Sequence, residues 1–166
     1  RVSPNVITGG KVGFSGRYFY NWESDKKVFI SAGRGANLSV RKSLLVKLGG
    51  FDRRYIGTYA YEDVDLCYRI RKSGYRIIFE PQASVKHLAL EEGGCSSGSA
   101  AQREYFRLHN AMLFYLKNMN KLFLPFMIFV FTAATLKKCL LGELKPADFT
   151  GILKGLYDGY KKYRGQ

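Results

Sequence analysis

The sequence has few cysteines, few acidic residues and no apolar run long enough to cross a bilayer. Three cysteines stand among 166 residues, without C-x-x-C spacing, which argues against a disulfide framework or a cysteine zinc site and favours a reducing compartment. The longest apolar stretch, residues 122–136, has 15 residues, below the ~20 of a spanning helix. The chain therefore reads as a globular domain with one short apolar segment.

Positive charge is what the chain has in excess. Lys and Arg number 27 against 13 acidic residues, a formal net charge of +14, while 46% of the residues are hydrophobic. Residues 51–100 hold seven of the acidic residues and an equal number of basic ones. The excess predicts attraction to an anionic partner such as nucleic acid, acidic lipid or a phosphorylated small molecule. The balanced block is where carboxylate chemistry is to be sought.

The order of expected elements is mixed α/β. Glycine- and aromatic-rich residues 1–34 predict short strands and loops. The pattern further predicts helices over 41–48, 62–73 and 102–118, strands over 75–79 and 83–88, a loop over 91–101, and a basic amphipathic segment over 152–163. We see no internal repeat.

Two carboxylates, Glu62 and Asp63, open the predicted helix 62–73. A carboxylate held at a loop–helix junction is suited to general-base work on a hydroxyl. The alternative is that both residues only complement the helix dipole. Asp63-Val64-Asp65 matches D-x-D, but residues i and i+2 of a helix point about 200° apart, so we reject them as a chelating pair.

The two histidines are weaker candidates. His87 alternates with Ala83 and Val85 on one face of the expected strand. It is either a hydrogen-bonded core residue or a metal ligand that needs further partners. His109 lies in a predicted helix without an obvious ligand partner, and we expect it to be structural.

An ordered set of motifs carries a family resemblance. The motifs are Gly35-Ala36-Asn37-Leu38-Ser39-Val40-Arg41, Leu48-Gly49-Gly50-Phe51-Asp52, Tyr61-Glu62-Asp63-Val64-Asp65-Leu66-Cys67-Tyr68-Arg69, Gly74-Tyr75, Pro81 and Val85-Lys86-His87, followed by Arg107-Leu108-His109-Asn110 and Lys117-Asn118. Over residues 33–120 this resembles the acceptor-side half of family 2 glycosyltransferases, rhamnosyltransferase-like members above all. The resemblance implies a partial GT-A fold, the C-terminal half, followed by C-terminal helices. It places the acceptor and catalytic half at 1–118 and an apolar, basic helical tail at 119–166.

The resemblance also implies roles for single residues. Asp63 looks like the base that deprotonates the acceptor hydroxyl, and Glu62 like its acceptor-binding neighbour. His87 is similar to a histidine that helps to hold a divalent metal, Mn²⁺ or Mg²⁺, on the nucleotide diphosphate. Substrate-binding positions carried over from the motifs are Gly35, Asn37, Arg69 and Arg107.

The expected reaction is inverting transfer from a nucleotide-sugar to a glycan or lipid-linked acceptor in cell-envelope polysaccharide or glycolipid synthesis. The family's nucleotide-binding half, with the Asp ligands of the metal, normally precedes this region and is not in these 166 residues. We therefore expect a part of a longer enzyme and no turnover by the isolated chain.

The tail suggests a surface partner. Lysines flank residues 122–136, and basic residues follow at 152–164, which suits a helix lying on anionic lipid; a core helix is the alternative. We expect a cytoplasmic protein, peripheral on the inner face of the cell membrane, and no nucleic-acid partner. A non-catalytic basic membrane-docking or nucleic-acid-binding module remains the competing function.

Overall fold

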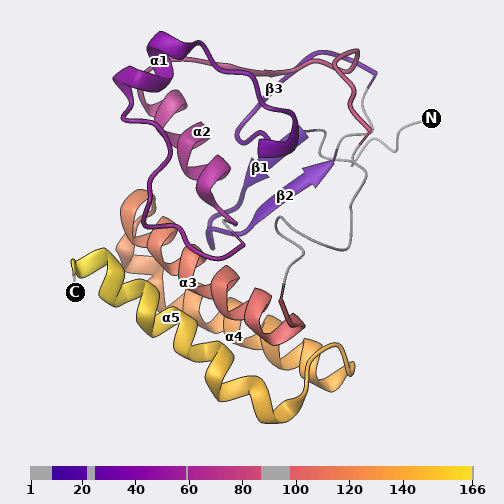
Figure 1. Ribbon diagram of the computed structural model, residues 1–166, viewed down its shortest axis with the longest axis vertical. Coiled ribbons are helices and arrows are strands. Elements are labelled where there is room, and N and C mark those ends of the chain that lie inside the picture. Colours follow the sequence, from indigo (N-terminus) through magenta and orange to yellow (C-terminus); the bar gives the residue numbers. More distant parts are fainter. Residues whose placement is uncertain (1–8, 22–24, 59, 87–97, 166) are drawn as a thin grey trace. The chain divides into compact units, whose positions relative to one another are not determined.

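The structure, a computed structural model, describes residues 9–21, 25–58, 60–86 and 98–165 (Figure 1). The elements are β1 (Gly9–Val12), β2 (Tyr18–Asn21), β3 (Val28–Ile30), η1 (Gly35–Asn37), α1 (Lys42–Lys47), α2 (Glu62–Lys72), β4 (Ile77–Phe79), α3 (Ala100–Asn118), η3 (Lys121–Phe123), α4 (Leu124–Leu140), η4 (Pro146–Asp148) and α5 (Phe149–Arg164). The chain forms two compact units: unit 1 is residues 1–13, 17–52 and 62–88, and unit 2 is residues 14–16, 53–61 and 89–166.

Unit 1 combines two small sheets with helices α1 and α2. Strands β1 and β2 pair antiparallel with Gly9 opposite Asn21, and β3 and β4 pair antiparallel with Val28 opposite Phe79. Helix α2 has its acidic residues in the first turn and basic residues in the last, the arrangement that the helix dipole favours. Its buried face carries Leu66 and Ile70, whose four-residue spacing puts them on one side of the helix.

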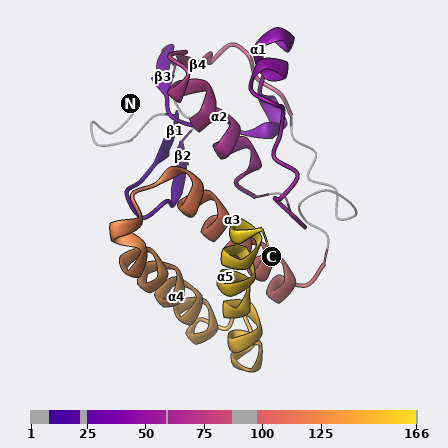
Figure 2. The ribbon, with the colours of Figure 1, turned by 90° about the vertical axis from the view of Figure 1, so that its left-hand side faces the viewer.

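Unit 2 contains the three long helices α3, α4 and α5 (Figure 2). Ser99 caps α3, since its Oγ accepts from the Gln102 N–H at 3.1 Å. Leu108, Leu113 and Phe114 of α3 are fully buried. The loop 53–61 belongs to this unit: the amide of Asn110 binds both the N–H and the carbonyl of Ile56, at 3.2 and 3.0 Å.

The mixed α/β class is confirmed, and the helices are close to their predicted bounds. The predicted strand 83–88 is wrong where it is described, because residues 83–86 pair with no strand, and residues 87–88 lie outside the described residues. The apolar stretch 122–136 belongs to a longer helix, Lys121–Leu140, whose 20 residues are long and apolar enough to cross a membrane by length and composition. Pro125 lies in the first turn of α4, where it breaks no helical hydrogen bond. The sequence expectation that this segment is too short therefore fails.

Two expectations stay predictions. The GT-A topology rests on the resemblance alone. The predicted domain boundary after residue 118 stays a prediction as well. The compact units do not follow it, since they group α3, which precedes residue 118, with α4 and α5.

Candidate functional site

Asp63 lies in the first turn of α2 and ties this helix to the loop 33–37 within unit 1. Its Oδ2 accepts the Gly35 N–H at 2.9 Å, and its Oδ1 accepts the Val64 N–H at 2.8 Å. The aspartate therefore has a structural task, which is to hold the backbone of η1 against the helix start. Each carboxylate oxygen still keeps acceptor capacity, because a carboxylate has about four lone-pair sites.

The surroundings of Asp63 make it a stronger base than an exposed aspartate. Burial raises its pKa, and the N–H groups of Gly35 and Val64 and the charge of Arg34 offset only part of that rise. The pKa of Glu62 is also raised, first by burial and then by the charge of Asp63. A raised pKa brings a carboxylate closer to the operating pH of a general base.

Cys67 lies one turn after Asp63 and binds the same loop. Its Sγ accepts the Gly33 N–H at 3.2 Å, and burial raises the pKa of the thiol to about 11, so the thiol stays protonated and unreactive. The Tyr20 hydroxyl donates to the Gly33 carbonyl at 3.3 Å. Burial and the charge of Asp63 raise the pKa of Tyr20, which keeps it a neutral hydroxyl beside the carboxylate. The sequence analysis gave neither residue a role: Cys67 appeared only as a member of the motif 61–69, and Tyr20 lies outside the motifs.

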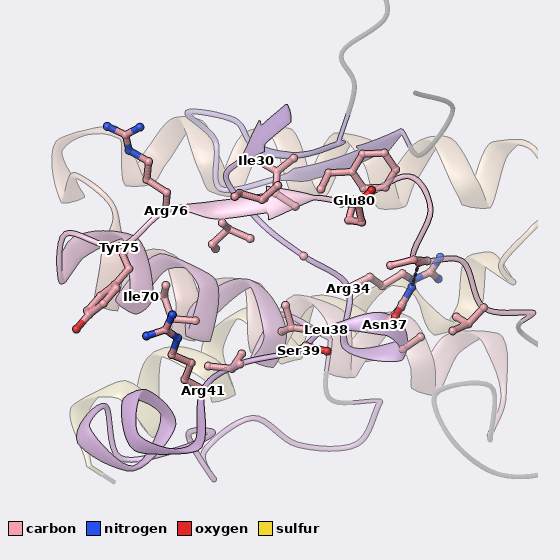
Figure 3. Close-up of a pocket in the computed structure, with 18 of the residues that line it drawn as sticks. Ile30, Arg34, Asn37, Leu38, Ser39, Arg41, Ile70, Tyr75, Arg76 and Glu80 are labelled. Atoms are coloured by element: carbon pink, nitrogen blue, oxygen red, sulfur yellow. Dashed lines mark hydrogen bonds between the residues drawn. The ribbon is translucent and has the colours of Figure 1, made fainter. Parts of the chain in front are cut away.

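A cavity of about 860 Å³ opens beside this loop. In Figure 3, Ile30 and Leu38 face it from opposite sides, Arg34, Asn37 and Glu80 lie toward one end, and Tyr75 and Arg76 toward the other. Asn37 is fixed there, because its Nδ2 donates to the Ala83 carbonyl at 2.6 Å. The cavity thus has an apolar interior with cationic side chains around it, of the size that small-molecule sites have.

The predicted site residues of unit 1 have different surroundings. Gly35 and Asp63 are in direct contact, and Asn37 lines the neighbouring cavity, whose lining does not include Asp63. Arg69 is bonded to Asp65 at 2.9 Å and to the carbonyls of Leu48 and Gly50 at 2.7 Å each. The substrate-binding role predicted for Arg69 therefore competes with a structural one.

Arg107 belongs to unit 2, where it binds Glu104 through two nitrogen atoms at 2.5 and 2.8 Å. This fork is the strong bidentate geometry of arginine and carboxylate. His109 is buried, and its Nδ1 lies 2.9 Å from Asn110 Oδ1, in agreement with a structural role. Burial lowers its pKa, so the ring stays neutral.

The described residues do not form a metal centre. In the ranges given above, no three His, Cys, Asp or Glu side chains gather closely enough to hold a metal ion. His87 lies outside the described residues, so its role as a metal ligand stays a prediction. The two carboxylates of the D-x-D sequence have separate partners, since Asp63 binds Gly35 and Asp65 binds Arg69.

Comparisons with known proteins give a partial match. A protein named N-acetylglucosaminyl-diphospho-decaprenol L-rhamnosyltransferase, from Mycobacterium tuberculosis (strain CDC 1551 / Oshkosh), is 44% identical over 54 residues, which are 32% of this chain and 17% of that protein. The protein of the same name from strain ATCC 25618 / H37Rv matches over the same shares. No family model and no solved structure matches significantly. The match thus spans about a sixth of the length of these curated relatives and about a third of this chain.

Proposed function

We propose that this chain is the acceptor-side part of a family 2 glycosyltransferase of GT-A fold, with Asp63 as the general base. The observation that carries the proposal is the Asp63 carboxylate, with its raised pKa, anchored at a helix start by the Gly35 N–H. The similarity to rhamnosyltransferases supports the reaction class.

The proposed reaction is a single displacement with inversion. An acceptor hydroxyl gives its proton to a carboxylate oxygen of Asp63 while its oxygen forms a bond to the anomeric carbon of the donor sugar. The bond from that carbon to the nucleoside diphosphate breaks, and the diphosphate leaves with the electron pair. Asp63 then returns its proton to solvent, which restores the carboxylate. Removal of such a base typically costs 10²–10⁴-fold in rate.

The neighbouring residues would bind and orient the acceptor. Glu62 adjoins the base on α2 and is an acceptor of hydrogen bonds from sugar hydroxyls. Gly35 holds Asp63, and Asn37 presents its side chain at the cavity. The divalent metal that the resemblance implies, Mn²⁺ or Mg²⁺, would be held by Asp side chains of the nucleotide-binding half with help from His87, and it would stabilise charge on the leaving diphosphate.

The substrates that we propose are inferred from the names of the matched relatives and from the family resemblance. The relatives' name specifies a diphospho-decaprenol acceptor, so we propose a nucleotide-sugar donor and a lipid-linked or glycan acceptor in cell-envelope synthesis at the cytoplasmic side. Family 2 enzymes bind the nucleotide with a half that precedes this region, so we expect no turnover by the 166 residues alone.

The test is Asp63→Asn in the complete product of the gene, assayed with a panel of nucleotide-sugars and a polyprenyl-diphosphate-linked N-acetylglucosamine acceptor. The asparagine oxygen can accept the Gly35 N–H, but the amide nitrogen cannot accept the Val64 N–H, and the side chain takes up no proton. We expect a 10²–10⁴-fold loss of kcat with unchanged donor binding and only a small fall in Tm. Asp25→Asn, which neutralises an exposed aspartate of the same unit, should leave kcat unchanged.

A second variant separates chemistry from structure. Asp63→Ala removes both the base and the tether to Gly35, so it should lower kcat and Tm together. If Asp63 only supports the loop, D63N will transfer sugar at the wild-type rate while D63A alone is impaired. That result would remove Asp63 as the base and favour the non-catalytic alternative.

A further inference from the structure

Helix α4 uses only one narrow face inside unit 2. Its buried residues are Met127, Phe131, Thr135 and Cys139, a run with a spacing of four that defines one side of the helix. Thr135 Oγ1 lies 3.3 Å from Glu104 Oε1 of α3, and the Arg107 guanidinium lies 5.1 Å from the centre of the Phe131 ring. This side of α4 is therefore the one that packs on α3.

The opposite side of α4 is apolar and exposed. We call it the apolar face; its residues are Phe126, Phe129, Ala133, Leu136 and Leu140 of α4, together with Leu122 of the preceding η3. Their spacing alternates between four and three, which keeps them in one line along a helix. Leu140, Leu122 and Phe129 are 79%, 77% and 67% exposed. Soluble proteins rarely leave such a continuous apolar surface uncovered.

The charges on the helix that carries the apolar face are all positive, and the first acidic residue beyond its end is the exposed Glu143. Residues 121–140 contain no acidic residue, and their basic residues, Lys121, Lys137 and Lys138, stand at the two ends. Lys137 is exposed, and so is Lys145 beyond the end of the helix. An apolar surface with cationic margins is complementary to a bilayer with anionic headgroups, since the lysines reach phosphates while the apolar side chains enter the acyl boundary.

The contacts of α4 favour a position on the membrane rather than across it. Lys138 Nζ binds Glu104 Oε2 at 2.8 Å, and Glu104 also binds Arg107. To enter the hydrocarbon core, α4 would either break this ion network or draw the charged helix α3 with it. Charged side chains are costly at the bilayer centre, so the helix keeps its buried side on unit 2 and offers only the apolar face to lipid.

We propose that the apolar face of α4 docks unit 2 onto the surface of an anionic bilayer, with the helix axis parallel to the membrane plane. This docking is independent of Asp63 and of the reaction proposed above, because no residue of the apolar face belongs to unit 1.

The experiment is flotation of the purified 166-residue chain with vesicles of phosphatidylcholine alone or mixed with phosphatidylglycerol. We expect the chain to float with the mixed vesicles at low salt, and binding to fall at least tenfold with phosphatidylcholine alone. The variant F129D/L140D should lose at least tenfold in partitioning onto the mixed vesicles. The matched control V46D/F51D adds the same charge at exposed apolar residues of unit 1, at 70% and 43% exposure, and should bind with no more than a twofold loss.

Three results would overturn the proposal. The first is that the wild-type chain does not float with the mixed vesicles at low salt. If sedimentation then shows that the wild type is a dimer and that F129D/L140D is a monomer, a second copy of the chain covers the apolar face. The second is equal loss of binding in both double variants, each with wild-type helical circular dichroism. The third is resistance of the bound chain to extraction at alkaline pH, which marks a spanning helix; its release supports surface docking.

Discussion

The two units of this protein are held together in different ways. In unit 1, the three-residue strands β3 and β4 help to line a cavity of about 860 Å³, and polar side chains of α2 hold the loops by binding their backbone. In unit 2, long helices pack closely, and side chains bind other side chains from α5 to α3 and from α4 to α3. The difference indicates that the loops of unit 1 are held in place by a few hydrogen bonds and ion pairs from α2. A ligand that enters the cavity of unit 1 meets fixed polar groups and open space.

The first prediction, with the largest expected effect on stability, removes the main directional bond of unit 1. Arg69→Ala leaves Asp65, whose side chain is completely buried, without its cation and takes the donor from the carbonyls of Leu48 and Gly50. Breaking a buried ion pair by removal of one partner costs about 3–5 kcal/mol. The rate of amide hydrogen exchange should rise in peptides from residues 42–52 and 62–72. Urea unfolding should measure the decrease in the free energy of unfolding.

Arg71→Ala is the control, because Arg71 is an exposed arginine on the same helix, and its loss should stay within about 0.5 kcal/mol. If R69A is as stable as R71A, unit 1 does not depend on this bond and the contrast between the units is wrong. A variant that keeps its stability but loses substrate affinity would instead support the binding role that the motifs predict for Arg69.

The second prediction tests the side-chain network of unit 2 by acid. Burial of Glu104 raises its pKa, but the hydrogen bonds and charges of Arg107 and Lys138 outweigh burial and lower the pKa from 4.5 to about 2. Because the folded-state pKa lies below the unfolded one, Glu104 stabilises the fold fully above pH ~4.5. The contribution, on the order of 3 kcal/mol, is lost as the pH falls toward 2.

The measurement is urea unfolding between pH 2 and 6 for the wild type and Glu104→Gln. The wild type should lose stability steeply below pH 4.5, and the variant should show a shallower slope and a lower stability at pH 6. Glu143→Gln, at an exposed glutamate, should reproduce the wild-type slope. Parallel curves for wild type and E104Q would show that Arg107 and Lys138 do not hold this carboxylate in its charged form.

Local patterns predicted much of this fold. The acidic start and basic end of residues 62–73 correctly predicted α2, and the Gly49-Gly50 pair correctly predicted the end of α1, where both glycines have positive φ, 77° and 70°. Residues 83–86 have a strand-like sequence but form no strand, because a strand forms only where a partner lies alongside, and among the described residues β4 pairs with β3 alone. Pairing between distant segments is not visible in a local pattern.

The candidate site was predictable only in part. The carboxylates at the start of α2 were found from their position in the chain. Two hydrogen bonds hold the loop 33–35 against α2 beside Asp63. One joins Asp63 to Gly35, 28 residues away in the sequence, and the other joins Cys67 to Gly33, 34 residues away. Such contacts arise from tertiary folding, so neither the role of Cys67 nor the raised pKa of Asp63 could be inferred from composition or spacing.

The third prediction has the smallest effect and concerns how closely the helices of unit 2 approach. Gly151, Gly155 and Gly159 repeat every four residues along α5, a spacing that the sequence analysis overlooked. A Cβ at Gly159 would lie 2.3 Å from the His109 carbonyl oxygen, and one at Gly155 would lie 2.4 Å from that of Tyr105, whereas a Cβ at Gly151 meets nothing within 4 Å. Small residues at this spacing let two helix backbones come together.

Gly159→Ala should therefore destabilise the fold by about 1–3 kcal/mol, the usual cost of overpacking, although alanine is the better helix former. Gly151→Ala has the same helix-forming gain without the clash, so it should stabilise the fold by about 0.5–1 kcal/mol. Thermal unfolding of the two variants measures both changes in one experiment. Because the substitution is identical, opposite signs isolate the close approach of α5 to α3 as the cause. Equal stabilisation at both positions would mean that the helices separate at little cost, and unit 2 would then be no more tightly packed than the loops of unit 1.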